Sequence, residues 1–265
     1  MAANDKVLTV LDPALNMARQ SLYRFAAMLL LDPKCDSWEH LHTLRSDPIL
    51  TEASAFVAQR PQAKPEELGL GERPLEDLVP QHVFERLPDS SQALNEEYEN
   101  TFGLLVSNAC PPYETEYIDG KLTFQRSNAL ADVSGFYRAF GLTISRQHPE
   151  RHDHIVLELE FMAFLLGLER RAVEEGASSS SEKAAVCRDA QQKFFEEHLV
   201  WWVPAFSRLL AREDQGGFYE AVAHYLAALI PAERALLGVE IPARPCEPSP
   251  LERPEECEGC LLASQ

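Results

Sequence analysis

The chain has 265 residues, of which 45% are hydrophobic and 25% charged, a balance typical of a soluble globular protein with one large domain or two small ones. Its 42 acidic and 24 basic residues give a formal net charge of −18. This charge argues against a general nucleic-acid-binding protein and against docking on an anionic membrane, because both functions need a basic face. It suits a partner that carries a positive segment.

Neither a membrane-spanning segment nor a signal peptide is expected. The longest strongly apolar stretch, Phe25 to Leu31, is far shorter than the roughly 20 residues that cross a bilayer. The N-terminal segment MAANDKVLTVLDPALN lacks a basic region followed by an apolar one. We therefore expect a cytoplasmic protein without stable membrane insertion, in which the six cysteines are reduced.

Apolar residues recur at helical spacing over almost the whole chain. Asp12 is suited to cap the first helix and Pro13 to occupy its first position. Helices are expected from residue 13 to the residue before Asp32, around 38–44, from Pro48 through Val57, around 75–87 with an interruption at Pro80, from about 91 to Gly103, from a cap at Asn128 to Gly141, over about 153–175 and 182–199, from Pro204, and around 218–229. The prediction is an all-α helical bundle of roughly ten helices.

Composition divides the chain into two halves and a tail. An N-terminal helical half is expected over residues 1–110 and a C-terminal helical half over 111–241, with a structured loop within 104–127 that crosses between them. Residues 242–265 are rich in proline, cysteine and acidic residues. Such a segment buries too little apolar surface to order itself, so we expect a disordered tail.

The segment 151–154, Arg-His-Asp-His, has two interpretations. A His-Asp pair binds a divalent metal in some all-α phosphohydrolases, but that site needs a further histidine and aspartate, and no other histidine is well placed. The simpler interpretation is that Asp153 caps the long helix that follows. Glu158 and Glu160 would then be solvated or paired surface charges.

A second motif, Cys-Pro-Pro-Tyr-Glu-Thr-Glu-Tyr, covers residues 110–117. Tyrosine rings beside prolines make an apolar surface with polar tips that can grip an extended peptide, and Glu114 and Glu116 would attract a basic one. The alternative is a proline-stiffened loop whose tyrosines pack inward.

A third motif is the pair Cys257 and Cys260, which could ligate zinc or act in redox chemistry. Cys246 would supply only a third ligand, so an exposed, reduced tail is the simpler interpretation. The chain also lacks the glycine-rich phosphate loops and the nucleophile elbow of common enzyme classes. No metal, no cofactor and no catalytic residue are therefore predicted.

Three motifs in this order, CPPYETEY, LADVSGFYRAFGL and ERHDHIVLELEFM, resemble the TorD/NarJ/DmsD family of cytoplasmic molybdoenzyme chaperones. With NEEYENTFG upstream and FFEEHLVWWVPAFSRLL downstream, the resemblance covers roughly residues 15–235. It implies an all-α fold in two halves joined by a hinge. It also implies a chaperone that binds the twin-arginine signal peptide of an apo-oxidoreductase of the dimethyl sulfoxide reductase type, and that holds back its export until the molybdenum cofactor is inserted.

The resemblance also implies where the peptide binds. Asp153 and His154 match a Pro-Asp-His element of the family, with His152 in place of the proline. The acidic proline-tyrosine motif and the aromatic helix before it match further positions. The candidate peptide-binding residues are Tyr98, Phe102, Pro112, Tyr113, Glu114, Glu116, Tyr117, Asp153, His154 and Glu158. The carboxylates among them suit arginine, which prefers bidentate acidic partners.

The expected partners are thus the apo molybdoenzyme catalytic subunit and its signal peptide, with no nucleic acid, and the chain acts as a monomer or a domain-swapped dimer. The contrasting hypotheses are a metal-dependent phosphohydrolase or nucleotide hydrolase on an all-α scaffold, and a structural subunit of a redox complex. Recovery of a large precursor with a twin-arginine leader would favour the chaperone, whereas metal-dependent turnover would favour an enzyme.

Overall fold

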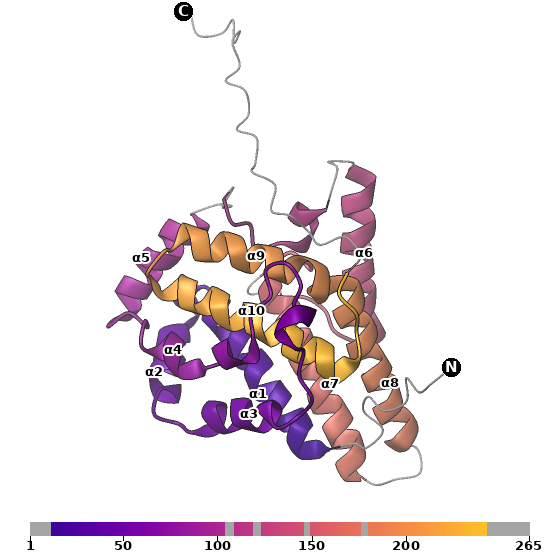
Figure 1. Ribbon diagram of the computed structural model, residues 1–265. Helices are drawn as coiled ribbons and strands as arrows, with labels where there is room; N and C mark the ends of the chain where they lie inside the picture. The colour runs from indigo at the N-terminus through magenta and orange to yellow at the C-terminus, as the bar shows by residue number, and fades with distance from the viewer. Residues whose placement is uncertain (1–11, 104–108, 119–122, 146–148, 176–179, 243–265) are drawn as a thin grey trace, which may run out of the picture.

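The computed structural model describes residues 12–103, 109–118, 123–145, 149–175 and 180–242 (Figure 1). The predicted tail, with Cys246, Cys257 and Cys260, lies outside these residues. Within them the structure is all-α, as predicted, and the only β pairing is an isolated antiparallel bridge between Tyr113 and His154.

The helices follow one another with short connections. The α-helices are α1 (Pro13–Leu30), α2 (Ser37–Leu44), α3 (Ile49–Ala58), α4 (Pro80–Phe84), α5 (Ser91–Phe102), α6 (Thr123–Ala139), α7 (Ile155–Glu175), α8 (Ser180–Phe194), α9 (Val200–Glu213) and α10 (Phe218–Leu237). Short 3-10 turns are η1 (Pro33–Cys35), η2 (Pro65–Glu67), η3 (Leu75–Asp77) and η4 (Glu114–Tyr117), and a π-helical segment, η5 (Phe195–Leu199), joins α8 to α9.

Several predicted helix ends are confirmed by their capping contacts. The side chain of Asp12 accepts hydrogen bonds from the backbone N–H groups of Ala14 and Leu15, at 3.0 and 3.3 Å, and Pro13 is the first residue of α1. Ser90 caps α5 in the same way. Gly141, just after α6, has a φ of +74°, the left-handed conformation that glycine adopts most readily after a helix.

Three predicted boundaries were wrong. Pro80 begins α4 rather than interrupting a helix, because its ring suits the first turn. Asn128 lies inside α6, which already begins at Thr123. Pro204 lies inside α9, because the chain continues from α8 through η5 and a proline removes only one of the helix's hydrogen bonds.

Helix α7 runs through the centre of the bundle. It packs against α1 on one side and α8 on the other, while α10 packs against α9, α4 and η3 (Figure 1). Buried apolar side chains from α1, α7, α9 and α10 form one cluster, which includes the fully buried Trp202. The core thus contains residues from both predicted halves, whose boundary stays a prediction.

A buried ion pair joins the first helix to the last. Arg19 of α1 donates from Nε to Oε2 of Glu233 in α10, at 3.0 Å, and makes a second contact to the other carboxylate oxygen. Both side chains are about 2% exposed. Removing one partner of such a pair leaves an uncompensated buried charge, so this contact helps to fix α1 against α10.

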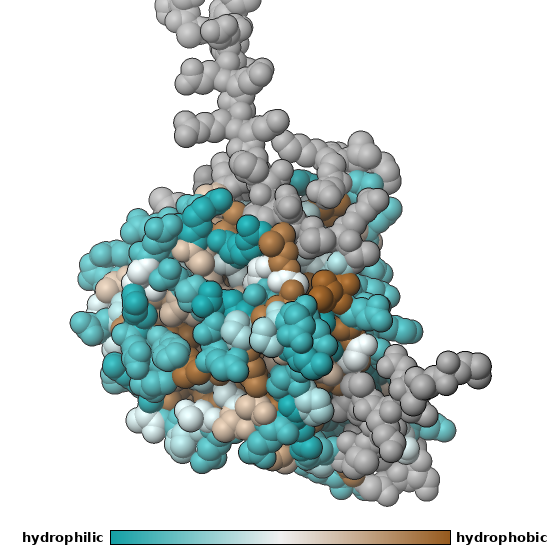
Figure 2. All heavy atoms as spheres, in the orientation of Figure 1, coloured by the Kyte–Doolittle hydropathy of each residue, from teal (hydrophilic) through white to brown (hydrophobic). Residues whose placement is uncertain are grey.

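The visible surface is mostly hydrophilic, as the net charge leads one to expect, with smaller hydrophobic patches between the polar side chains (Figure 2). In the part of the chain that the structure describes, no helix combines the length and the apolarity needed to traverse a bilayer.

Candidate functional site

The two central sequence motifs lie against each other. The backbone N–H of Glu114 donates to the carbonyl of Asp153, and the N–H of Ile155 donates to the carbonyl of Pro112, both at 2.9 Å. Tyr113 and His154 form the bridge between these hydrogen bonds. The segment of η4 is thereby fixed to the start of α7, although about 40 residues separate the two along the chain.

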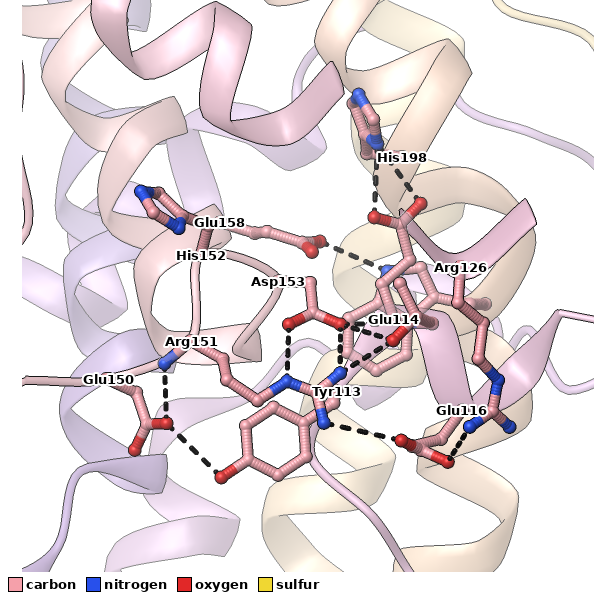
Figure 3. A network of polar contacts seen from close by, with 12 residues as sticks. Tyr113, Glu114, Glu116, Arg126, Glu150, Arg151, His152, Asp153, Glu158 and His198 are labelled. Atoms are coloured by element: carbon pink, nitrogen blue, oxygen red, sulfur yellow. Dashed lines mark hydrogen bonds and ion pairs between the residues drawn. The ribbon is translucent and has the colours of Figure 1, made fainter. Parts of the chain in front are cut away.

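Asp153 is the best-connected residue of this junction (Figure 3). Its fully buried carboxylate accepts two hydrogen bonds from the guanidinium of Arg151, from Nε to Oδ1 at 3.0 Å and from Nη2 to Oδ2 at 2.8 Å. Oδ2 also accepts from the backbone N–H and the hydroxyl of Thr115, at 3.1 and 2.7 Å. This carboxylate is therefore engaged by a guanidinium, not available to a metal as the His-Asp hypothesis requires.

The helix-capping role predicted for Asp153 was wrong. Helix α7 begins at Ile155, and the side chain that caps it is His154, whose Nδ1 accepts from the N–H of Val156 at 3.2 Å. The cap lies one residue later than predicted because the side chain of Asp153 turns toward η4. Burial lowers the pKa of His154, which favours the neutral ring that this acceptor role needs.

Arg151 has further partners around its guanidinium. Nη1 donates to Oε1 of Glu116 at 3.3 Å, and the charged carbon lies 4.2 Å from the centre of the Tyr113 ring, a cation–π distance. Burial alone would lower the pKa of Arg151, but Asp153 and Glu116 outweigh it and raise that pKa. We call the surroundings of this guanidinium the guanidinium pocket, formed by the side chains of Tyr113, Thr115, Glu116 and Asp153.

The rim of the guanidinium pocket is more open. The hydroxyl of Tyr113 donates to Oε1 of the exposed Glu150 at 3.2 Å, and burial together with that carboxylate raises the pKa of Tyr113 to about 12. Burial is the main cause that raises the pKa of Tyr98 in α5, followed by the charge of Asp32. The charges of Tyr113 and Glu150 raise it further, so Tyr98 lies near this rim. Glu116 is only partly exposed and forms a second ion pair, with Arg126, at 3.1 Å.

Glu114 and Glu158 lie beneath the guanidinium pocket and not on its surface. Glu114 is 2% exposed, and its carboxylate contacts Nδ1 of His198 at 3.1 Å and accepts from the indole N–H of Trp201 at 3.2 Å. Burial raises the pKa of Glu114, and His198 partly offsets this rise. A peptide arginine therefore has no direct path to the Glu114 carboxylate.

The expectation that Glu158 is a surface charge was wrong. It is fully buried, because α7 is surrounded by other elements, and it accepts from the indole N–H of Trp202 at 3.1 Å. Burial and then the neighbouring Glu114 raise its pKa well above the usual value, which favours the neutral acid. Glu160, by contrast, is exposed as predicted.

The remaining candidates belong to the packing around the site. Tyr117 is buried, its hydroxyl donates to the carbonyl of Pro111 at 3.0 Å and its ring lies 5.2 Å from that of Trp202, so the inward-packing alternative holds for this tyrosine. Pro112 is also buried. Phe102 is 5% exposed and contacts the rings of Tyr98 and Tyr219. Of the ten candidates, six gather at or directly beneath the pocket: Tyr113, Glu114, Glu116, Asp153, His154 and Glu158.

Sequence reasoning missed three participants. Arg151 was visible two residues before Asp153, but the spacing did not show that it would bind that carboxylate. Thr115 lies between two glutamates, and its residue type gave no signal that it would bind Asp153. His198 lies more than 80 residues after Glu114, within the segment FFEEHLVWWVPAFSRLL, and nothing in the spacing indicated that the two side chains would meet.

Residues 62–208, more than half of the chain, match the family model described as nitrate reductase delta subunit. Curated relatives include the selenate reductase assembly chaperone of Thauera selenatis, which is 34% identical over 44% of this chain and 57% of its own length. Chaperone protein TorD of Aliivibrio salmonicida is 26% identical over 57% of this chain and 67% of its own. The perchlorate reductase assembly chaperone of Dechloromonas aromatica is 39% identical over 30% of this chain and 33% of its own.

No solved structure matches the chain significantly. The family model and the named relatives agree with the resemblance seen in the motifs CPPYETEY, LADVSGFYRAFGL and ERHDHIVLELEFM. All three motifs lie within the matched residues 62–208. The chain therefore belongs to the nitrate reductase delta subunit family, and its resemblance to the TorD/NarJ/DmsD chaperones is confirmed.

Proposed function

We propose that the chain is a cytoplasmic assembly chaperone for a molybdenum-cofactor oxidoreductase of the dimethyl sulfoxide reductase type, and that it is not itself an enzyme. The names of the relatives support this, since they include assembly chaperones for selenate and perchlorate reductases. The aligned part of the chain spans 57% of the selenate reductase chaperone and 33% of the perchlorate reductase chaperone.

In this proposal the chaperone binds the twin-arginine signal peptide of its client at the guanidinium pocket. The observation that carries the proposal is the position of Arg151, whose planar guanidinium fits between a bidentate carboxylate, a hydroxyl and an aromatic ring. Arginine rather than lysine matches this geometry, because its fork of donors pairs with both carboxylate oxygens while its flat face stacks on a ring.

Arg151 acts as an internal occupant that the first or second arginine of the peptide replaces. Its side chain is 40% exposed, so the guanidinium itself can move into solvent when a peptide arginine takes its place. Asp153 is fully buried, and leaving a buried carboxylate without a cationic partner is costly, so the exchange substitutes one guanidinium for another. Tyr113 and Tyr98 offer apolar surface beside the pocket for the residues that flank the arginines.

The test is a titration of the full chain with a synthetic twin-arginine signal peptide and with the same peptide carrying two lysines. We expect the lysine peptide to bind at least about tenfold more weakly, because lysine loses the bidentate and stacking contacts. Equal affinity for the two peptides would show that charge alone is recognised and would contradict binding at the guanidinium pocket.

A further inference from the structure

We propose that Asp132, Glu197 and His198 form a divalent-metal site suited to zinc. These residues lie where α6 faces the π-helical segment η5, on the side of His198 away from Glu114. The inference does not rest on the proposed peptide binding, because none of the three residues belongs to the guanidinium pocket.

The three side chains converge. One possible ligand atom from each, a carboxylate oxygen of Asp132, a carboxylate oxygen of Glu197 and a ring nitrogen of His198, lies within 4.8 Å of the others. Asp132 and Glu197 are exposed, whereas His198 is only 2% exposed. The cluster therefore has a buried, fixed side and an open side.

His198 supplies the observation that points to a ligand. Its Nδ1 lies 3.1 Å from both oxygens of the buried Glu114 carboxylate, and its Nε2 is buried without a hydrogen-bond partner among the residues that the structure describes. Oδ2 of Asp132 is 3.6 Å from Nε2, too far for a hydrogen bond. Figure 3 shows one ring nitrogen on Glu114 and the other directed away from it.

This is the arrangement that metal-binding histidines use. A carboxylate that accepts from one ring nitrogen fixes the ring and leaves the lone pair of the other nitrogen for a metal. Without a metal, a buried polar nitrogen that lacks a partner is costly. The rings of Phe136 and Phe194, centred 5.4 and 4.8 Å from the His198 ring, also limit its rotation.

The local backbone supports the same site. Glu197 and His198 both lie in η5, and π-helical segments are rare and occur often at functional sites. The wider turn of a π-helix reduces the angle between successive side chains, which lets two adjacent residues reach one point. Asp132 comes from the facing helix and closes the cluster.

The donor set suits zinc. One imidazole nitrogen with two carboxylate oxygens satisfies three positions of a tetrahedral zinc ion and leaves the fourth for water. A surface depression lined by Asn128, Ala129, Ala131 and Asp132 gives solvent access on the open side. Because the ligands must be deprotonated, binding should release protons and weaken at acidic pH.

The experiment titrates Zn²⁺ into the full-length chain by calorimetry. Cysteine thiolates are good zinc ligands in general, so the background is the full-length variant with Cys246, Cys257 and Cys260 replaced by serine. We expect one zinc per chain in this background. Absence of zinc binding to it would overturn the proposal.

The decisive variants are Asp132→Asn and Glu197→Gln, whose side chains are exposed and whose replacement leaves the His198 packing intact. Each should weaken zinc binding at least tenfold, whereas the matched control Asp189→Asn, an exposed carboxylate on α8, should leave it unchanged. Zinc affinity that is the same in both decisive variants and in the control would overturn the site.

Co²⁺ supplies an independent readout in the same background. Bound by one nitrogen and two carboxylates, it should give the visible absorption of four- or five-coordinate cobalt, and Asp132→Asn should abolish it. A cobalt spectrum that is unchanged by Asp132→Asn would place the metal elsewhere and contradict the proposal.

Discussion

The guanidinium of Arg151 holds the carboxylate of Asp153 through two parallel hydrogen bonds, Nε to Oδ1 at 3.0 Å and Nη2 to Oδ2 at 2.8 Å. The side chain of Asp153 is fully buried, whereas that of Arg151 is 40% exposed. The pair thus joins the interior of the η4–α7 junction to the surface. In the proposed binding mode, a peptide arginine approaches this carboxylate from the side that Arg151 now occupies.

Replacing Asp153 with asparagine separates its two interpretations. A helix cap would tolerate the change, because asparagine caps about as well as aspartate. Since Asp153 binds Arg151 and Thr115 instead, we expect the free energy of unfolding to fall by about 1.5–3 kcal/mol, the usual value of a hydrogen bond to a charged group.

The same variant should bind the twin-arginine peptide about 10- to 150-fold more weakly, by the usual conversion of that energy. Chemical denaturation and peptide titration measure the two effects, and Asp189→Asn is the matched control. Unchanged stability together with unchanged affinity in this variant would show that Asp153 does not take part in peptide binding.

Replacing Glu158 with glutamine tests its protonation. In wild type the folded state keeps a proton on this carboxyl at pH values where the unfolded state, with a pKa of about 4.3, has lost it. The folded state then binds more protons, so this group makes the free energy of unfolding decrease as pH rises above about 4.3 toward the raised folded pKa.

Glutamine cannot titrate, so Glu158→Gln should flatten this decrease and be at least as stable as wild type at the upper end of the range. Denaturation at a series of pH values measures it, with the exposed Glu182→Gln on α8 as control. A pH dependence that is the same in wild type and in Glu158→Gln would show that Glu158 is charged in the folded protein.

Peptide affinity should depend on salt. The chain carries a formal charge of −18, and the Debye length shrinks from about 30 Å at 0.01 M to about 10 Å at 0.1 M ionic strength. We therefore expect the affinity for the twin-arginine peptide to fall across this range. Calorimetry at the two salt concentrations is sufficient, and a constant affinity would mean that apolar contacts dominate recognition.

Local sequence patterns were sufficient to predict much of the fold. Asp12 with Pro13, and Ser90 with Gly103, mark helix ends through contacts within a few residues, so the sequence itself carries this information. The prediction that a helix starts at Pro204 was wrong because the start of α9 depends on the π-helical segment before it. No local sequence rule predicts that segment.

The two motifs at the centre of the candidate site could be recognised from the sequence, whereas the burial of their side chains could not. The motifs around Tyr113 and Asp153 stood out in sequence, and the structure brings them together. Burial of Glu114 and Glu158 depends on indole donors from Trp201 and Trp202, which the chain supplies from α9. Such long-range partners decide whether a carboxylate meets a ligand or the core, and spacing does not reveal them.

The most direct test of the account is the affinity of Arg151→Gln for the twin-arginine peptide. If Arg151 occupies the place of a peptide arginine, removing it should increase affinity by about 10- to 150-fold, since the peptide no longer displaces charge-assisted hydrogen bonds of about 1.5–3 kcal/mol. The control Arg170→Gln, which removes an exposed ion pair on α7, should bind as wild type does. An Arg151→Gln variant that stays folded and binds the peptide no more tightly than wild type would contradict the account.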